Sequence, residues 1–125
     1  QMESRFILTG YKDNMMDYIA AADVFVQLSD FEAGGTAAKE AAYLEKIVIA
    51  VRGVGDIDEY MFHEQNAIML DPKKKKALCV AYLRAIYQNR TPFEGYGARL
   101  KQAVMKAFPI AHTEAYEALH REIQG

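Results

Sequence analysis

The chain has a single cysteine, Cys79, no tryptophan and three prolines among its 125 residues. One thiol excludes a disulfide within the chain and a metal cluster held by cysteines, and it indicates a reducing compartment. No apolar run approaches the ~18 residues of a membrane span. The N-terminal residues also lack the basic flank and long apolar stretch of a signal peptide. We therefore expect a cytoplasmic protein.

Neither sign of charge dominates, because fifteen Lys and Arg residues face seventeen Asp and Glu residues and the formal net charge is -2. This balance argues against nucleic acid as the main partner. The hydrophobic fraction of 51% and the charged fraction of 26% are those of a globular protein. A chain of this length buries enough surface for one core, so we expect a single domain over residues 1–125.

Short apolar runs alternate along the chain with longer stretches of helical periodicity. This alternation predicts repeated strand-helix units and hence an α/β fold with a mostly parallel sheet of about four strands. The runs are almost wholly apolar, as expected for strands that helices cover on both faces. The predicted strands are Phe6–Thr9, Val24–Leu28, Ile47–Val51 and Ala67–Leu70.

Helices are predicted from apolar residues that recur every three or four positions. Asp56 and Asp58 are expected to cap or charge a short helix, and Asp71 with Pro72 suits the start of a long one. The first predicted helix begins near Asp13 or Asn14, the second runs from Thr36 to Glu45, and a short third one ends near Phe62. A long helix extends from Asp71 to Thr91. Two further helices are predicted around Leu100–Phe108 and Tyr116–Ile123.

The segment Ser29–Glu40 joins the carboxyl end of a predicted strand to a helix, which is where open α/β sheets bind ligands. Two glycines permit a tight turn there, and free backbone amides at a helix start suit an anionic group such as a phosphate. The glycines are Gly34 and Gly35, and the amides are those of Gly35, Thr36 and Ala37.

Two carboxylates flank this amide cluster, Glu32 before it and Glu40 one turn into the helix. Each can accept hydrogen bonds from hydroxyl groups on either side of a bound phosphate, which fits a sugar nucleotide. A Gly-Gly helix start also occurs without a ligand, and Glu40 is equally compatible with a solvated helix position.

The segment Ala22–Ala42 resembles a motif of the family 4 retaining glycosyltransferases, in which a strand ending in Pro-Ser leads to a glutamate, seven residues and a second glutamate followed by alanine. The two glutamates are here Glu32 and Glu40. The similarity covers nearly the whole chain and includes Phe6–Tyr11, Ile47–Val51, Val54-Gly55 with Glu59, Asn66 before Ile68–Leu70, and Phe108 with Tyr116.

The resemblance implies the C-terminal, Rossmann-like three-layer half of a two-domain GT-B enzyme, which binds a nucleotide-sugar donor and uses neither a metal nor a cofactor. Glu32 would be the catalytic residue that bonds the sugar hydroxyls, and Glu40 would hold the nucleotide ribose. The amides of Gly34, Gly35, Thr36 and Ala37 would face the sugar and the distal phosphate, and Gly10 and Tyr11 would contact the base.

The chain departs from the family pattern in several places. Ala33-Gly34-Gly35 replaces the common Gly-Phe-Gly, and Leu28 replaces the proline before Ser29. The family domain also begins with two further strand-helix units, which carry an Arg and a Lys for the diphosphate, and an N-terminal acceptor domain precedes it. None of these is present, so the resemblance implies an incomplete domain that is inactive by itself.

The missing strands would leave an exposed sheet edge. We expect the first strand either to pair in that gap or to be exchanged with another copy in a homo-oligomer. The alternative to a glycosyltransferase is a non-catalytic α/β module with a regulatory or sugar-binding interaction role, which the short length favours.

Three further groups of residues have competing interpretations. Lys73–Lys76 oppose the helix dipole, and they are either a solvated face or a contact with anionic lipid at the inner membrane surface. Asp56, Asp58 and Glu59 are explained by capping as well as by a metal. The histidines are expected on the surface, without a metal, and Cys79 in the core. The histidines are His63, His112 and His120.

Overall fold

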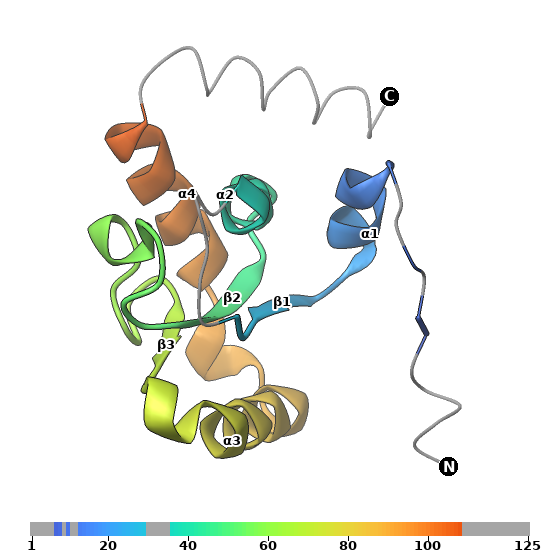
Figure 1. The fold of residues 1–125 in the computed structure, drawn as a ribbon, viewed down its shortest axis with the longest axis vertical. Helices are drawn as coiled ribbons and strands as arrows, with labels where there is room; N and C mark the ends of the chain where they lie inside the picture. Colours follow the sequence, from blue (N-terminus) through green and yellow to red (C-terminus); the bar gives the residue numbers. More distant parts are fainter. Residues whose placement is uncertain (1–6, 9, 11–12, 30–35, 109–125) are drawn as a thin grey trace.

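The computed structural model describes residues 7–8, 10, 13–29 and 36–108, and these form an α/β domain (Figure 1). The letter η denotes a 3-10 helix. In chain order the elements are α1 (Met15–Ala21), β1 (Val24–Gln27), α2 (Thr36–Tyr43), β2 (Ile47–Val51), η2 (Ile57–Glu59), β3 (Ile68–Leu70), η3 (Pro72–Lys74), α3 (Lys75–Gln88), η4 (Thr91–Phe93) and α4 (Tyr96–Ala107).

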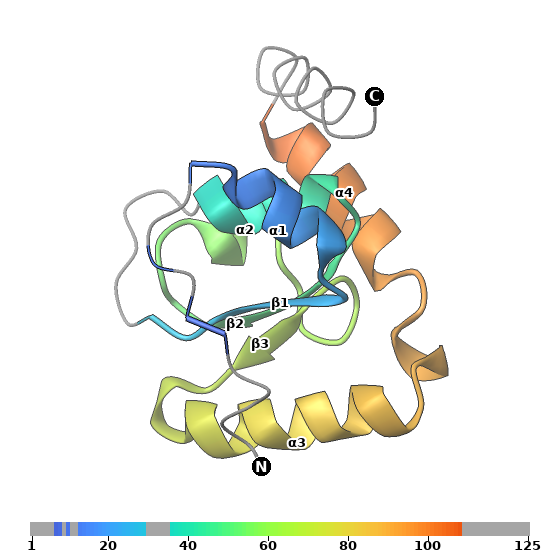
Figure 2. The ribbon, with the colours of Figure 1, turned by 90° about the vertical axis from the view of Figure 1, so that its right-hand side faces the viewer.

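The three described strands form one parallel sheet in the order β1-β2-β3. Val24 pairs with Ile47 in the first ladder, and Ile49 pairs with Ile68 in the second. Helices α1, α2 and α4 lie on one face of this sheet and α3 lies on the other (Figure 2). The predicted α/β fold with a parallel sheet between two helical layers is confirmed.

All five residues of β2 are buried because this central strand is covered on both faces. Successive side chains of a strand point to opposite faces. Accordingly, Val48 and Ala50 belong to the core cluster under α2 and α4, whereas Ile47 and Ile49 belong to the cluster over α3. This explains why the strand contains no polar residue.

Helix α2 approaches the sheet closely through small side chains. Ala38, Ala41 and Ala42 are fully buried in the same cluster as Leu100 and Val104 of α4. Among the described residues, no helix is both long and apolar enough to cross a membrane.

The N-terminal run differs from the sequence-based expectation. Ile7 and Leu8 belong to no strand and are 83% and 97% exposed, so the prediction of a buried strand is wrong at these two residues. The described sheet therefore has three strands instead of four, with β1 at one edge. The helix predicted over Tyr116–Ile123 lies outside the described residues.

The long helix begins slightly later than expected. The backbone N–H of Lys73 donates to Oδ1 of Asp71 over 2.9 Å, which confirms Asp71 as a cap. The capped turn is η3, however, and α3 starts at Lys75. Cys79 is buried against the sheet, as expected.

Candidate functional site

The carboxyl ends of the three strands lie at one edge of the sheet because all three run parallel. Three connections leave from this edge, one after each strand, and open parallel sheets bind their ligands there. The described parts of these connections are Leu28-Ser29, the first turns of α2, residues 52–56 and residues 71–75. We call this edge the carboxyl edge.

Four of the predicted site residues fall within the description. Gly10 is exposed and has a φ of 69°, a left-handed conformation that suits glycine. Thr36 is the first residue of α2, which also carries Ala37 and Glu40. Tyr11, Glu32, Gly34 and Gly35 lie outside the described residues, and so does the side chain of Thr36.

Glu40 carries a half-buried carboxylate near the start of α2. Burial raises the pKa of this carboxyl group above its usual value, because a desolvated site disfavours the charged form. Within the described part of the chain, no hydrogen bond or ion pair satisfies its side chain. The position therefore holds a partly desolvated acceptor that is available to a ligand.

A second polar side chain at this edge also lacks a partner. Gln27 ends β1 on the same side of the sheet as Phe25, which packs in the cluster beneath α2. Its Nε2 is buried and makes no hydrogen bond with the described residues. Buried polar groups are nearly always hydrogen-bonded in folded proteins, so this amide requires a partner such as a ligand or a water molecule.

Lys39 and Asp56 join the first turn of α2 to the loop after β2. Nζ of Lys39 lies 2.9 Å from Oδ2 of Asp56 and 3.9 Å from the ring centroid of Phe108. Oδ1 of Asp56 is buried and has no hydrogen-bond partner among the described residues. Asp56 makes no capping hydrogen bond to η2, so the expectation that its side chain caps this helix is wrong.

The loop after β2 is held by glycines and by Asp58. Gly53 and Gly55 have φ angles of 79° and 61°, which favour glycine. The N–H of Gly53 donates to Oδ2 of Asp58 over 2.9 Å, so Asp58 stabilises this turn and also places a negative charge in the first turn of η2, as expected. No group of three or more His, Cys, Asp or Glu side chains in the described residues is arranged to hold a metal.

Lys75 also reaches the carboxyl edge, from the start of α3. Its Nζ donates to the backbone carbonyl of Leu28 over 2.9 Å, directly after β1. Sequence analysis did not distinguish Lys75 from its three lysine neighbours. Its position in the first turn of a helix that packs on the sheet is the signal that could have distinguished it from the other lysines.

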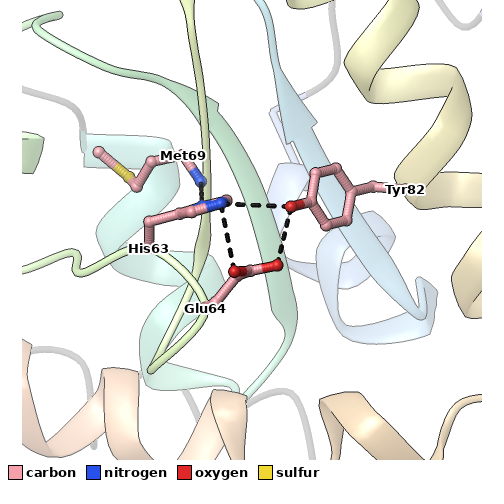
Figure 3. Close-up of polar contacts among 4 residues, drawn as sticks. All are labelled: His63, Glu64, Met69 and Tyr82. Atoms are coloured by element: carbon pink, nitrogen blue, oxygen red, sulfur yellow. Dashed lines mark hydrogen bonds and ion pairs between the residues drawn. The ribbon is translucent and has the colours of Figure 1, made fainter.

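A separate polar cluster fastens α3 to the outer edge of β3 (Figure 3). The N–H of Met69 donates to Nδ1 of His63 over 2.9 Å, which leaves the proton of a neutral imidazole on Nε2. Tyr82 Oη lies 3.2 Å from that Nε2 and donates to Oε2 of Glu64 over 2.9 Å. Burial, then the hydrogen bond to Glu64, raises the pKa of Tyr82 to about 12.

This cluster corrects the expectation that His63 is a surface residue, because its side chain is only 32% exposed and bonds to β3. Met69 belongs to an edge strand, and its N–H is directed at His63. The cluster therefore covers one edge of the described sheet and connects two layers of the fold.

Residues 1–103 match the family model described as "Glycosyl transferases group 1". Among solved structures, the chain is similar to a sucrose-phosphate synthase from Thermosynechococcus elongatus, with 27% sequence identity and a TM-score of 0.62. The match covers 85% of this chain but only 26% of that protein. A search of curated protein sequences finds no significant match.

Proposed function

Because the chain belongs to the family of group 1 glycosyl transferases, we propose that it is the donor-binding part of an enzyme that moves a sugar from a nucleotide-sugar to an acceptor, with retention of configuration. Its substrate site is the carboxyl edge of the sheet. The nucleotide-sugar is a substrate, and the proposed reaction needs no separate cofactor and no metal.

The observation that carries this proposal is the half-buried carboxylate of Glu40. A carboxylate accepts hydrogen bonds from two neighbouring hydroxyls, as on a nucleotide ribose, and binding such hydroxyls would compensate the desolvation that raises its pKa. The unpartnered amide of Gln27 supports a polar ligand at the same edge.

The start of α2 supplies the chemistry for the leaving group. A diphosphate gains negative charge as the sugar acquires oxocarbenium character in the transition state. Free backbone N–H groups in the first turn of α2, among them those of Thr36 and Ala37, would stabilise that charge. Glu32, assigned as catalytic by resemblance, would bond hydroxyls of the transferred sugar.

The chain spans about a quarter of the length of the sucrose-phosphate synthase that it matches. We therefore assign the acceptor site and the remaining diphosphate contacts to other segments of a larger protein. Such segments, or a strand exchanged with a second copy, would also pair with the edge of β1 that has no partner strand among the described residues.

Calorimetric titration with UDP, GDP and ADP tests the proposal, both for this chain and for any longer polypeptide that contains it. One of the three is expected to bind, and Glu40→Gln is expected to weaken that binding about tenfold, because it replaces a charged acceptor of hydrogen bonds. Glu94→Gln is the matched control, because Glu94 lines a hollow beside the opposite ends of β1 and β2. Binding of none of the three would overturn the proposal and favour a non-catalytic module.

A further inference from the structure

The carboxylate of Asp56 is held by one of its oxygens and unsatisfied at the other. Nζ of Lys39 lies 2.9 Å from Oδ2. Oδ1 is buried and has no hydrogen-bond partner within the described residues. A buried carboxylate oxygen that accepts no hydrogen bond loses its hydration without compensation, and such atoms are rare in folded proteins. Oδ1 of Asp56 is therefore an acceptor that needs a hydrogen-bond donor.

Lys39 determines which oxygen of Asp56 is left over. The side chains of Lys39 and Asp56 are 12% and 24% exposed, and the ammonium group lies 3.9 Å from the ring centroid of Phe108. An ammonium group can only donate hydrogen bonds, so it holds Oδ2 and leaves Oδ1 for another donor. Between the ring and the carboxylate, the lysine keeps Asp56 in one orientation.

The backbone around Asp56 is also fixed. The N–H of Gly53 donates to Oδ2 of Asp58, and the N–H of Glu59 donates to the carbonyl of Asp56 over 3.0 Å. The next residue, Ile57, is fully buried in the core cluster beneath α2 and α4. The fold therefore sets the position of the Asp56 carboxylate, as a binding group requires.

Asp56 and Glu40 lie at different sides of the first turns of α2. Successive residues of an α-helix point about 100° apart, so Glu40 does not share the direction of Lys39. Lys39 points toward Asp56 and toward Phe108 at the end of α4. Figure 1 draws α2 between α4 and α1, which places Asp56 on the α4 side. Glu40 is directed away from that side.

We propose that Oδ1 of Asp56 accepts a hydrogen bond from a hydroxyl group of the transferred sugar, with Lys39 as the positioning residue. This inference rests on the proposed function, in which the start of α2 faces the diphosphate and Glu40 holds the ribose. The ribose and the sugar are attached to opposite ends of the diphosphate. A carboxylate repels phosphate oxygens but accepts hydrogen bonds from hydroxyls. With the ribose at Glu40, the sugar is the part of the donor that suits Asp56.

Calorimetric titrations with paired ligands test this inference, in this chain or in a longer polypeptide that contains it. The nucleoside diphosphate that binds, among UDP, GDP and ADP, is compared with its glucose, galactose and mannose derivatives. Asp56→Asn is expected to lower the affinity for the derivative that binds about tenfold and to leave the diphosphate within about twofold. The reason is that Lys39 holds the amide oxygen, so an NH2 group replaces the acceptor Oδ1.

Variants of Lys39 test its positioning role. Lys39→Met releases the carboxylate and is expected to lower the affinity for the sugar derivative about fivefold relative to the diphosphate. Lys39→Arg keeps a cation beside Asp56 and is expected to retain more of this affinity. Asp23→Asn is the matched control, because Asp23 is an exposed acid that precedes β1 at the opposite edge of the sheet, and it should change neither affinity. Binding of the diphosphate verifies that each variant is folded.

The outcomes separate this inference from the proposed function. The role of Asp56 is overturned if the diphosphate binds but none of its sugar derivatives does, or if Asp56→Asn leaves both affinities unchanged. It is also overturned if Asp56→Asn lowers both affinities equally, since the residue would then only support the loop, or if Asp23→Asn has the same effect. Failure of all three diphosphates to bind would instead overturn the proposed function itself.

Discussion

Lys39 and Asp56 are 17 residues apart in the chain, yet their side chains form an ion pair of 2.9 Å. Lys39 also lies over the ring of Phe108 at the end of α4. One mostly buried ammonium group thereby connects α2, the loop after β2 and α4. Because Glu40 follows Lys39 directly, the ion pair also fixes the turn of α2 that carries Glu40, the residue proposed to bind the ribose hydroxyls.

Lys39→Met is expected to destabilise the protein by about 2 kcal/mol, because the carboxylate of Asp56 is then left mostly buried without its cation. Urea denaturation measures the change. Lys106→Met, at an exposed position of α4, is the control and should stay within about 0.5 kcal/mol of the unaltered chain. Equal effects of the two substitutions would show that the ion pair contributes nothing.

Glu40→Gln is expected to stabilise the protein near pH 7 while it weakens nucleotide binding. Burial raises the folded-state pKa of Glu40, so the ionised form is disfavoured and the glutamate's relative stability falls as pH rises through that pKa. Glutamine removes this penalty, and the gain should shrink as the pH is lowered below the usual glutamate pKa. Urea denaturation at several pH values measures the change in the free energy of unfolding. A loss of stability near pH 7 would contradict the interpretation of Glu40 as a desolvated carboxylate that is kept for ligand binding.

Gly97→Ala is expected to destabilise the protein by about 3 kcal/mol, although alanine normally favours a helix. An added Cβ would collide with the backbone carbonyl of Glu45, where α4 meets the end of α2. Gly53→Ala meets no atom within 4 Å and suffers only from its positive φ, which costs about 1 kcal/mol. Thermal unfolding compares the two, and a Gly97→Ala variant as stable as the original would refute the close packing of these helices.

Tyr82→Phe is expected to change how stability depends on alkaline pH. The folded-state pKa of Tyr82 is about 12, above the ordinary 10, so the folded protein holds this proton more tightly than the unfolded chain does. That contribution is complete below about pH 10 and is lost between about pH 10 and 12. The phenylalanine variant should lose less stability over this window in urea denaturation; an identical loss would show that Tyr82 titrates normally.

Periodicity predicted the elements whose burial follows from local sequence. The run Ile47–Val51 is a strand with the predicted bounds, and Leu78, Tyr82 and Ile86 of α3, which recur every four residues, pack in the cluster between this helix and the sheet. The run at Ile7 and Leu8 is equally apolar but is exposed, because a strand also needs a neighbour, and local composition cannot supply one.

Long-range polar pairs could not be predicted from spacing. Asp56 was interpreted as a cap, but its actual partner is Lys39 on another element. His63 and Tyr82 are 19 residues apart in the chain, and their side chains meet only because α3 packs against β3. Of the candidate site, Glu40 on α2 was identified from sequence, whereas the buried amide of Gln27 required the structure.

The most direct test of the donor-site proposal is to follow backbone amide signals of the isotope-labelled protein by NMR during titration with the nucleoside diphosphate that binds. We expect the largest shifts at Ser29, Ala37–Glu40 and Gly53–Asp56, which surround the carboxyl edge. Largest shifts at Glu94–Ala98, beside the opposite ends of the strands, would contradict the account.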